Sequence, residues 1–502
     1  MRKFITGMSF FLLSIGCFSA RAQLSVTGQL RVRTEYRNGY GNLPGVGSQP
    51  AFLTSQRMRI QMGYRSSRLV FQASVQDVRV WGADASTINN ADGARLAVHE
   101  AWGELVLANA RDSTLGHSVV DYFGIRLGRQ ELSYDDQRLI GNLDWLQQAR
   151  RHDAIVFRLL NNGWQADAGF AFNQNTDAFN YNGTYYTPAN VPGYVKDSKG
   201  NLAAVPPGFI PLTSAVGFSA RNGSPSLAAA PSTNAATQDY KSMQYVYVAR
   251  QWRRARLSGL LFFDEFGRYR PDSVRNIAGS DTGYLYGRRF NQPGVNARVT
   301  GGFFLTTPLD QHKDWRLQAG AFYQAGHDRD GLTLAAYTTT LSVTYGPRFF
   351  AETAGWDYLS GSNSFSGSRA DHRFDPLYGT PHKFWGYMDY FYAGTGSATG
   401  GLNNPFFKEK YTSRNSRLVV EVWYHYFGLA AAQKDVKGDA VPKYLGSEVD
   451  GVADYTIYKM TTLEAGVCGL WASTSMEYAK NSSPGAARRN AGWAYLQLNI
   501  KF

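Results

Sequence analysis

Arginine gives this 502-residue sequence its clearest chemical signal, within a formal net charge of +13. Arginines recur at every second position in LRVRTEYR (30–37) and in QRMRIQ (56–61), so they share one side of an extended chain. A guanidinium group stays charged at any relevant pH, and its planar, forked donors match carboxylates. The chemistry that these residues favour is the binding of an anion.

Covalent chemistry is not indicated by any motif. The eight histidines are scattered, with no two at a spacing that places a metal pair on one strand or helix turn. The sequence contains no GxSxG elbow, phosphate-binding loop, CxxC pair or HExxH helix. Residues 327–331 (HDRDG) have the spacing of part of a calcium loop but lack its later Glu, so we expect a plain turn. We predict no catalytic residue, no metal and no cofactor.

Charged positions alternate with apolar ones, which is the pattern of strands rather than helices. Leu24, Val26 and Leu30 fall on one face of the first such segment, and Arg31 and Arg33 fall on the other. Beyond the N-terminal segment there is no run of 18 apolar residues, so a membrane role requires a closed barrel. The sequence therefore predicts an all-β, transmembrane antiparallel barrel of about eighteen strands, apolar outside and charged inside. The expected strands are 24–37, 55–65, 68–79, 96–108, 121–131, 152–160, 164–174, 243–252, 256–266, 297–307, 314–325, 334–346, 348–359, 400–412, 416–428, 446–457, 460–472 and 492–502.

The connections alternate in length. Tight turns such as Ser66-Ser67 and Gly346-Pro347 alternate with long polar stretches, notably 175–242 and 360–399. Outer-membrane barrels have short periplasmic turns and long extracellular loops. This alternation favours such a barrel over a soluble sandwich or propeller.

The two ends of the chain predict export to the outer membrane. Residues 1–22 have a basic start, an apolar core and a small-x-small ending, which is typical of a secretory signal peptide. Cys17 leaves a lipoprotein signal as an alternative. We expect residues 23–502 to form a single barrel domain in the outer membrane of a Gram-negative bacterium, in contact with outer-membrane lipid. The amphipathic last segment ends in Phe502, resembling the signal that the barrel insertion machinery recognises.

The predicted lumen carries both charges. Its arginines are Arg31, Arg33, Arg57, Arg59, Arg65, Arg126, Arg158, Arg250, Arg298, Arg316 and Arg417. Its acids are Glu35, Asp167, Asp264, Glu421, Glu448, Asp450 and Glu464. Arginine in excess favours an anion-selective channel, whereas ion pairing across the wall would leave a neutralised polar lumen.

One charged segment resembles a known family. Residues 128–154, GRQELSYDDQRLIGNLDWLQQARRHDA, are similar to the characteristic region of the alginate-export family of outer-membrane porins, with its GRQ strand end, RLIG step, D-W pair and closing R-x-x-D-A. Three further stretches look similar in the same order: HKFWGYMDYF (382–391), RLVVEVWYHYF (417–427) and LGSEVDGVADYTIY (445–458).

The resemblance implies a monomeric barrel of eighteen strands with an arginine-lined constriction for a polyuronate such as alginate. By this analogy Arg129, Arg138 and Arg150 or Arg151 belong to the constriction. We expect the charged segment to fold against the lumen wall, with Leu139, Leu143 and Leu146 able to form one helical turn; a solvated surface loop is the alternative. The candidate substrate-binding residues are Arg31, Arg33, Arg57, Arg59, Arg126, Arg129, Arg138, Arg150, Arg151, Arg298 and Arg417.

The function predicted from the sequence is passive passage of an anionic polysaccharide or oligosaccharide, as in alginate export. The alternatives are a general or sugar/anion uptake porin with a mixed-charge lumen, a barrel enzyme, and a soluble carbohydrate-binding β-protein. Basic clusters such as Arg253-Arg254 are expected to be solvated or to meet lipid headgroups, because export removes nucleic acid as a partner.

Overall fold

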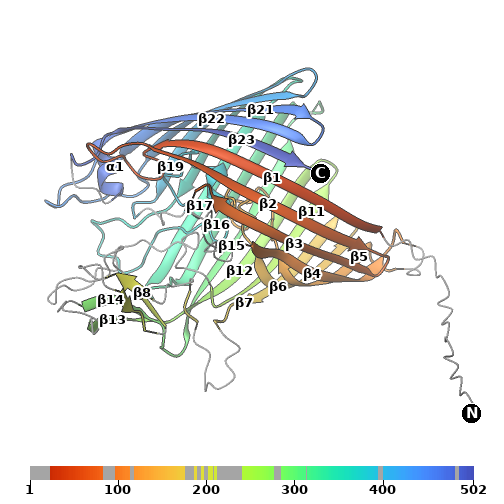
Figure 1. The fold of residues 1–502 in the computed structure, drawn as a ribbon, viewed down its shortest axis with the longest axis horizontal. Coiled ribbons are helices and arrows are strands. Elements are labelled where there is room, and N and C mark those ends of the chain that lie inside the picture. The colour runs from red at the N-terminus through yellow and green to blue at the C-terminus, as the bar shows by residue number, and fades with distance from the viewer. Residues whose placement is uncertain are drawn as a thin grey trace, which may run out of the picture.

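The computed structural model describes residues 23–82, 96–112, 118–175, 186–188, 194–196, 202–206, 208–211, 240–275, 284–312, 314–393, 399–480 and 485–502. In this part of the chain, eighteen strands pair antiparallel with their neighbours, and the last pairs with the first to close a barrel (Figure 1). No helix among these residues is long and apolar enough to cross a membrane. The predicted signal segment 1–22 lies outside the described residues.

The barrel strands follow one another in chain order around the wall. They are β1 (Gln23–Asn38), β2 (Ala51–Arg65), β3 (Leu69–Val80), β4 (Leu96–Asn109), β5 (Tyr122–Gln130), β6 (His152–Asn161), β7 (Trp164–Phe172), β11 (Ser242–Trp252), β12 (Ala255–Gly267), β15 (Val295–Pro308), β16 (Trp315–His327), β17 (Thr333–Tyr345), β18 (Phe350–Leu359), β19 (Leu402–Thr412), β20 (Leu418–Gly428), β21 (Tyr444–Tyr458), β22 (Thr461–Ala472) and β23 (Asn490–Lys501). Each of the eighteen predicted strands is confirmed, with ends displaced by a few residues.

The sequence did not predict the small elements outside the barrel wall. They are the pair β8 (Tyr194–Lys196) and β9 (Leu202–Ala204), the sheet of β10 (Phe209–Pro211), β13 (Arg270–Arg275) and β14 (Tyr284–Arg289), the 3-10 turn η2 (Pro381–Lys383) and the helix α1 (Thr474–Ala479). Such short elements contain too few residues to show a hydrophobic period. Helix α1 begins at the N-cap Ser473, whose side chain accepts a hydrogen bond from the backbone N–H of Ser475.

Side chains alternate across the wall as predicted. On β1, Leu24 is 71% exposed on the outer face, whereas Arg31 is 4% exposed on the inner face. The exposed outer face also carries Trp164, Trp252 and Trp315, which suits the aromatic belts at a membrane interface. The outer wall is therefore built for lipid and the inner wall for charge.

The two rims differ as the loop lengths predicted. Short turns at 66–68, 162–163 and 346–349 lie on the rim where β1 begins and β23 ends (Figure 1). The long connections, including 131–151 and 360–401, leave the opposite rim. We call residues 131–151 the β5–β6 loop and residues 371–393 the β18–β19 segment.

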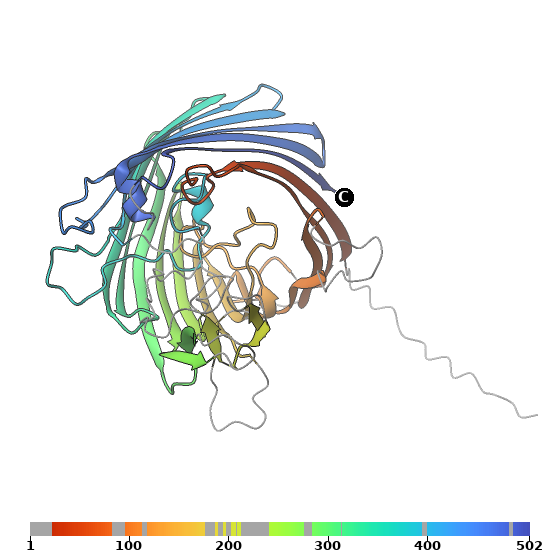
Figure 2. The ribbon, with the colours of Figure 1, turned by 60° about the vertical axis from the view of Figure 1, so that its left-hand side comes forward.

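The core lies inside the barrel because these two connections fold into it. Figure 2 shows the orange β5–β6 loop and the cyan part of the β18–β19 segment within the ring of strands. They pair with each other through a parallel bridge between Ile140 and Tyr378. Leu139, Ile140, Leu377 and Tyr378 are buried in one apolar cluster with lumen-facing residues of the wall. The expected packing of the loop inside the barrel is therefore confirmed.

The expected helical turn in the β5–β6 loop is wrong. Leu143 has a φ of 49°, and Asp135, Gln137 and Ala149 also have positive φ values. Such left-handed residues interrupt a right-handed helix. The loop instead makes a series of tight turns that present its carbonyl oxygens to the wall.

Candidate functional site

Four arginines form a cluster on the inner face of the first two strands. Arg31 on β1 lies directly opposite Arg57 on β2, and Arg33 and Arg59 lie one inward-facing position away on each strand. Arg31, Arg33 and Arg57 are buried and Arg59 is nearly so. Like charges directly opposite one another destabilise a strand pair, so this cluster requires compensation from elsewhere in the fold.

The β5–β6 loop supplies that compensation through Asp144. Arg57 Nη1 donates to Asp144 Oδ1 at 2.8 Å, and Arg31 Nη1 lies 3.4 Å from Asp144 Oδ2. Arg59 Nη1 lies 4.0 Å from the same carboxylate. Burial alone would raise the pKa of Asp144, but Arg57 and Arg31 outweigh it and hold the pKa below its usual value. One carboxylate is thus shared among three guanidinium groups.

Backbone and amide oxygens of the same loop complete the contact. Arg31 donates to the carbonyl of Asp144 at 2.8 Å, to that of Leu146 at 3.1 Å and to Gln147 Oε1 at 2.9 Å. Arg33 donates to the carbonyl of Trp145 at 3.0 Å. Arg33 also pairs with Glu35 at 3.1 Å, and Arg37 shares that carboxylate. Because peptide carbonyls carry no net charge, the four guanidinium groups still outnumber the carboxylates that contact them, which are Asp144, Glu35 and Glu131.

Trp145 joins the arginine cluster to the β18–β19 segment. The guanidinium carbon of Arg33 lies 4.1 Å from the centroid of the Trp145 ring, close enough for a cation–π interaction. The ring of His382 stacks on Trp145 with centroids 4.1 Å apart. His382 Nδ1 in turn contacts Asp389 Oδ1 at 2.8 Å. The two lumen-filling connections are therefore coupled at the cluster.

The β5–β6 loop also reaches the far wall of the barrel. Asp135 accepts hydrogen bonds from Tyr247 on β11 at 2.6 Å and from Ser258 on β12 at 2.8 Å. Arg138 forms an ion pair of 2.9 Å with Asp357 on β18, and its guanidinium lies over the ring of Phe384. The loop is thus fixed to opposite sides of the lumen and narrows it.

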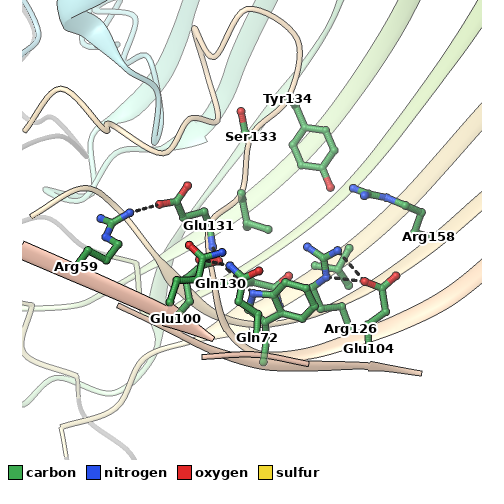
Figure 3. Close-up of a pocket in the computed structure, with 14 residues that line it drawn as sticks. Arg59, Gln72, Glu100, Glu104, Arg126, Gln130, Glu131, Ser133, Tyr134 and Arg158 are labelled. Atoms are coloured by element: carbon green, nitrogen blue, oxygen red, sulfur yellow. Dashed lines mark hydrogen bonds and ion pairs between the residues drawn. The ribbon is translucent and has the colours of Figure 1, made fainter. Parts of the chain in front are cut away.

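A cavity of about 470 Å³ adjoins the cluster between the β5–β6 loop and strands β2 to β6. Figure 3 shows Arg59 pointing at Glu131 on one side and Arg126 paired with Glu104 on the other. Its lining is Arg59, Gln61, Gln72, Glu100, Trp102, Glu104, Arg126, Gln130, Glu131, Leu132, Ser133, Tyr134, Val156 and Arg158. A second cavity, of about 410 Å³, shares Arg59 and Glu131 with the first. Arginine therefore meets acids, amides and aromatic rings in these cavities.

The remaining arginines predicted inside the barrel are mostly paired. Arg126 lies 2.7 Å from Glu104, and Arg150 donates to the carbonyl of Gly379 at 2.6 Å. Arg298 is buried between Asp264 at 2.5 Å and Asp375 at 2.8 Å. Arg298 is neutralised where it stands, so its contacts are those of a structural ion pair.

Three arginines predicted inside the barrel lie elsewhere, and their placement in the lumen is wrong. They are Arg129 and Arg151, two of the constriction candidates, and Arg417, which was predicted on the inner face of a strand. Arg129 forms a two-fold hydrogen bond with Asp153 on the outer face of the wall, where their side chains are 38% and 52% exposed. Arg151 lies beside this pair. Arg417 is exposed in the short turn that precedes β20, one residue before the strand begins.

Arg250 was also assigned to the wrong face. Its neighbours Val246 and Val248 are exposed, whereas Tyr245 and Tyr247 are buried inside the barrel against Tyr134 of the β5–β6 loop. The lumen is apolar at this point because it packs on the loop. The rule that apolar residues face lipid therefore fails on β11.

Sequence reasoning missed Gln147, Trp102 and His382. Gln147 contacts Arg31, Trp102 lies under Arg126, and His382 stacks on Trp145. In each pair the two residues are far apart in the chain. The D-W pair in the charged segment was the one local signal, since it contains Asp144 and Trp145. Among the described residues, His99, Glu100 and Glu131 have ligand atoms close enough together to hold a metal ion.

A closed barrel of eighteen antiparallel strands, with lipid-facing apolar side chains and a charged lumen, is the architecture of an outer-membrane channel. The protein is such a channel and lies in the cell outer membrane; its fold is not that of an enzyme. The family described as alginate export matches residues 22–173. The resemblance seen in the motifs is thus confirmed over the part of the chain that contains β1 to β7 and the β5–β6 loop.

Solved structures agree on the architecture. The chain is similar to OccK9 (OpdG) of Pseudomonas aeruginosa, with 12% identity, a TM-score of 0.52 and coverage of 95% of this chain and 98% of that one. It is also similar to OpdK of Pseudomonas aeruginosa, with 10% identity, a TM-score of 0.50 and the same coverage. At these identities the similarity shows the fold alone. No curated protein matches the sequence.

Proposed function

We propose that the channel passes an anionic oligosaccharide or polysaccharide, of the uronate class, through an arginine-lined lumen. The observation that carries the proposal is the cluster of four arginines on β1 and β2. Arg31, Arg57 and Arg59 share Asp144, Arg33 pairs with Glu35, and the other contacts of Arg31 and Arg33 are mainly neutral oxygens. A uronate carboxylate offers the same two oxygens as Asp144, so it can compete for the same donors. The alginate-export match over residues 22–173 covers this cluster and supports the proposal.

The adjoining cavity suits a sugar in the same path. Trp102, with Arg126 over its ring, and Tyr134 provide aromatic side chains. Gln61, Gln72 and Gln130 provide amide donors and acceptors along its wall. Passage needs contacts that are favourable enough to admit the solute and weak enough to release it. A row of partly compensated arginines meets both needs, because each contact with the solute replaces one that already exists.

A general or sugar/anion uptake porin fits the geometry equally well. Glu100, Glu104 and Glu131 line the same cavity as the arginines, which makes it mixed in charge. Such a lumen passes small polar solutes without preference for a polyanion. The two functions differ in whether the arginines bind uronate more strongly than a neutral sugar.

Channel block in planar bilayers separates them. We expect a short oligouronate to block the current of the wild-type channel at concentrations at least tenfold below those of a neutral oligosaccharide of equal length. Arg57→Gln is expected to remove most of this difference. It deletes the guanidinium that donates to Asp144, for which the uronate carboxylate would compete. Arg129→Gln, on the outer face, is the matched control and should leave the block unchanged. Equal block by both sugars in the wild type would favour the uptake porin.

A further inference from the structure

A β-bulge in β4 turns two consecutive side chains into the barrel. Ser74 of β3 pairs with Glu100 and Val75 pairs with Val98, so His99 is the extra residue between them. In a regular strand His99 and Glu100 would point to opposite faces. Here both are buried, with exposures of 0% and 8%. Bulges of this kind are over-represented beside functional sites, where they re-aim a side chain.

Glu131 reaches the same point from the neighbouring strand. It is the first residue after β5, and its Oε1 lies 2.6 Å from Nε2 of His99. One ligand-type atom from each of His99, Glu100 and Glu131 lies within 4.8 Å of the other two. Glu100 and Glu131 line the cavity of Figure 3, so the group can be reached from the lumen.

Neighbouring donors hold both carboxylates in place. Glu100 accepts from Gln72 Nε2 at 2.6 Å and from Trp102 Nε1 at 3.0 Å. Asn142 Nδ2 donates to the second oxygen of Glu131 at 2.9 Å. Metal-binding carboxylates are oriented in the same way by hydrogen bonds from outside the ligand shell.

The group as it stands leaves a buried polar atom unsatisfied. Nδ1 of His99 has no hydrogen-bond partner among the described residues, although the side chain is fully buried. A neutral ring protonated on Nε2 leaves a lone pair without a donor, and a charged ring leaves an N–H without an acceptor. Either state carries the cost of a buried, unpaired polar atom. The two carboxylates beside this imidazole carry negative charge that a bound cation would offset.

Arg59 is the cation that now approaches the group. Its Nη1 lies 3.6 Å from Glu131 Oε1, too far for a good hydrogen bond. Its Nε and Nη2 donate to Gln76 Oε1 at 3.1 and 2.8 Å. Because Gln76 already holds the guanidinium, a metal ion bound to Glu131 would repel Arg59 without leaving it unpartnered.

We infer that His99, Glu100 and Glu131 form a binding site for a divalent first-row transition cation of the zinc type. One imidazole nitrogen and two carboxylate oxygens suit such an ion, and three protein ligands leave a position open to water in the cavity. The bound ion ties the beginning of the β5–β6 loop to β4. This inference does not depend on which solute the channel passes. The histidine spacings gave no sign of the site, because the bulge and the β4–β5 pairing bring its ligands together.

Zinc titration of the purified barrel in detergent, against a chromogenic chelator, tests the inference with Zn²⁺ alone as the probe. We expect one ion per barrel, with affinity reduced at least tenfold in both His99→Asn and Glu131→Gln. His312→Ala removes an exposed histidine at the short-turn rim and should leave binding unchanged. Heat-modifiable gel migration verifies that each variant is folded.

The titration also has outcomes that overturn the inference. The inference is overturned if the wild type does not bind zinc stoichiometrically. It is also overturned if the wild type and Glu131→Gln bind zinc equally. Glu131→Gln remains informative if His99→Asn does not fold. Loss of binding in His312→Ala alone identifies an adventitious surface ion and also overturns it.

Discussion

The two connections that fill the lumen meet walls of opposite charge. The β5–β6 loop turns carbonyl oxygens and Asp144 toward Arg31 and Arg57 on β1 and β2. The β18–β19 segment turns backbone N–H groups toward carboxylates on β21: Met388 N donates to Glu448 at 2.9 Å and Tyr387 N donates to Asp450 at 3.2 Å. Each connection presents the backbone groups that complement its wall.

The two connections show how polypeptide can narrow a charged lumen without burying a charged side chain that lacks a hydrogen-bond partner. Peptide groups can satisfy guanidinium or carboxylate groups equally well, depending on which end they present. Because a peptide group has a dipole but no net charge, these contacts do not change the net charge of either wall. Arg57 and Arg59 of the arginine wall line a cavity that an anionic solute can enter, and the carboxylate wall stands three strands away around the barrel.

Asp144→Arg should have the largest effect, on the contact between the β5–β6 loop and the arginine wall. It removes the carboxylate shared by Arg31, Arg57 and Arg59 and adds a fourth positive group among them. We expect the loop to leave the wall and the single-channel conductance to rise at least twofold. The loss of docking should be on the order of 2–3 kcal/mol, less than for a fully buried pair because the Asp144 side chain is 43% exposed.

Asp153→Arg is the matched control for this change. Asp153 also pairs with an arginine, Arg129, but on the outer face of the wall. The single-channel conductance of Asp153→Arg should equal that of the wild type. If both variants conduct alike, the β5–β6 loop does not restrict the lumen.

Glu448→Gln tests the contact between the β18–β19 segment and the carboxylate wall. The substituted amide keeps an oxygen that can accept from Met388 N, so the segment should stay in place. Glu448 Oε2 has no hydrogen-bond partner among the described residues, and the change removes one of two neighbouring buried carboxylates. We expect stability to change by about 1 kcal/mol or less and the permeability ratio to move modestly toward anions. A shift toward cations in the same bilayer measurement would show that this wall does not face the solute path.

A smaller effect is expected where the β18–β19 segment begins. Asp328, in the loop after β16, is buried, and burial together with Asp330 and Asp371 raises its pKa to about 6. The folded state therefore keeps a proton that the unfolded chain has lost above about pH 4. The stability from this group is complete below the unfolded pKa and is lost as pH rises through 6.

Asp328→Asn tests that pH dependence. The carboxylate oxygen that it replaces, Oδ2, has no partner among the described residues, and Oδ1 can still accept from Asp330 N and Leu332 N. At pH 7.5 the variant should be more stable by on the order of 1–2 kcal/mol. Unfolding of the detergent-solubilised barrel at pH 4.5 and 7.5 measures this, and the wild-type decrease between these values should be smaller in the variant. An unchanged decrease would assign it to other groups.

The sequence was sufficient for the barrel because a lipid-facing wall imposes a period of two over every strand. The same alternation places the arginines of β1 and β2 correctly. It also separates Arg126 from Arg129 in YFGIRLGRQ, three residues apart and therefore on opposite faces. The wrong placement of Arg129 came from the family resemblance and disagreed with the alternation.

The interior of the lumen could not be predicted in the same way. Its contacts join residues remote in the chain, such as Ile140 with Tyr378, and no local pattern encodes them. Where the loop packs on β11, the lumen face is aromatic and looks like a lipid face. The bulge at His99 likewise depends on the pairing of β3 with β4.

The arginine cluster on β1 and β2 should set the charge preference of the channel. The reversal potential across a bilayer with a KCl gradient measures this preference. We expect anion selectivity in the wild type, a clear shift toward cations in Arg57→Glu and no shift in Arg129→Glu. A cation-selective wild type, or equal shifts in the two variants, would contradict it.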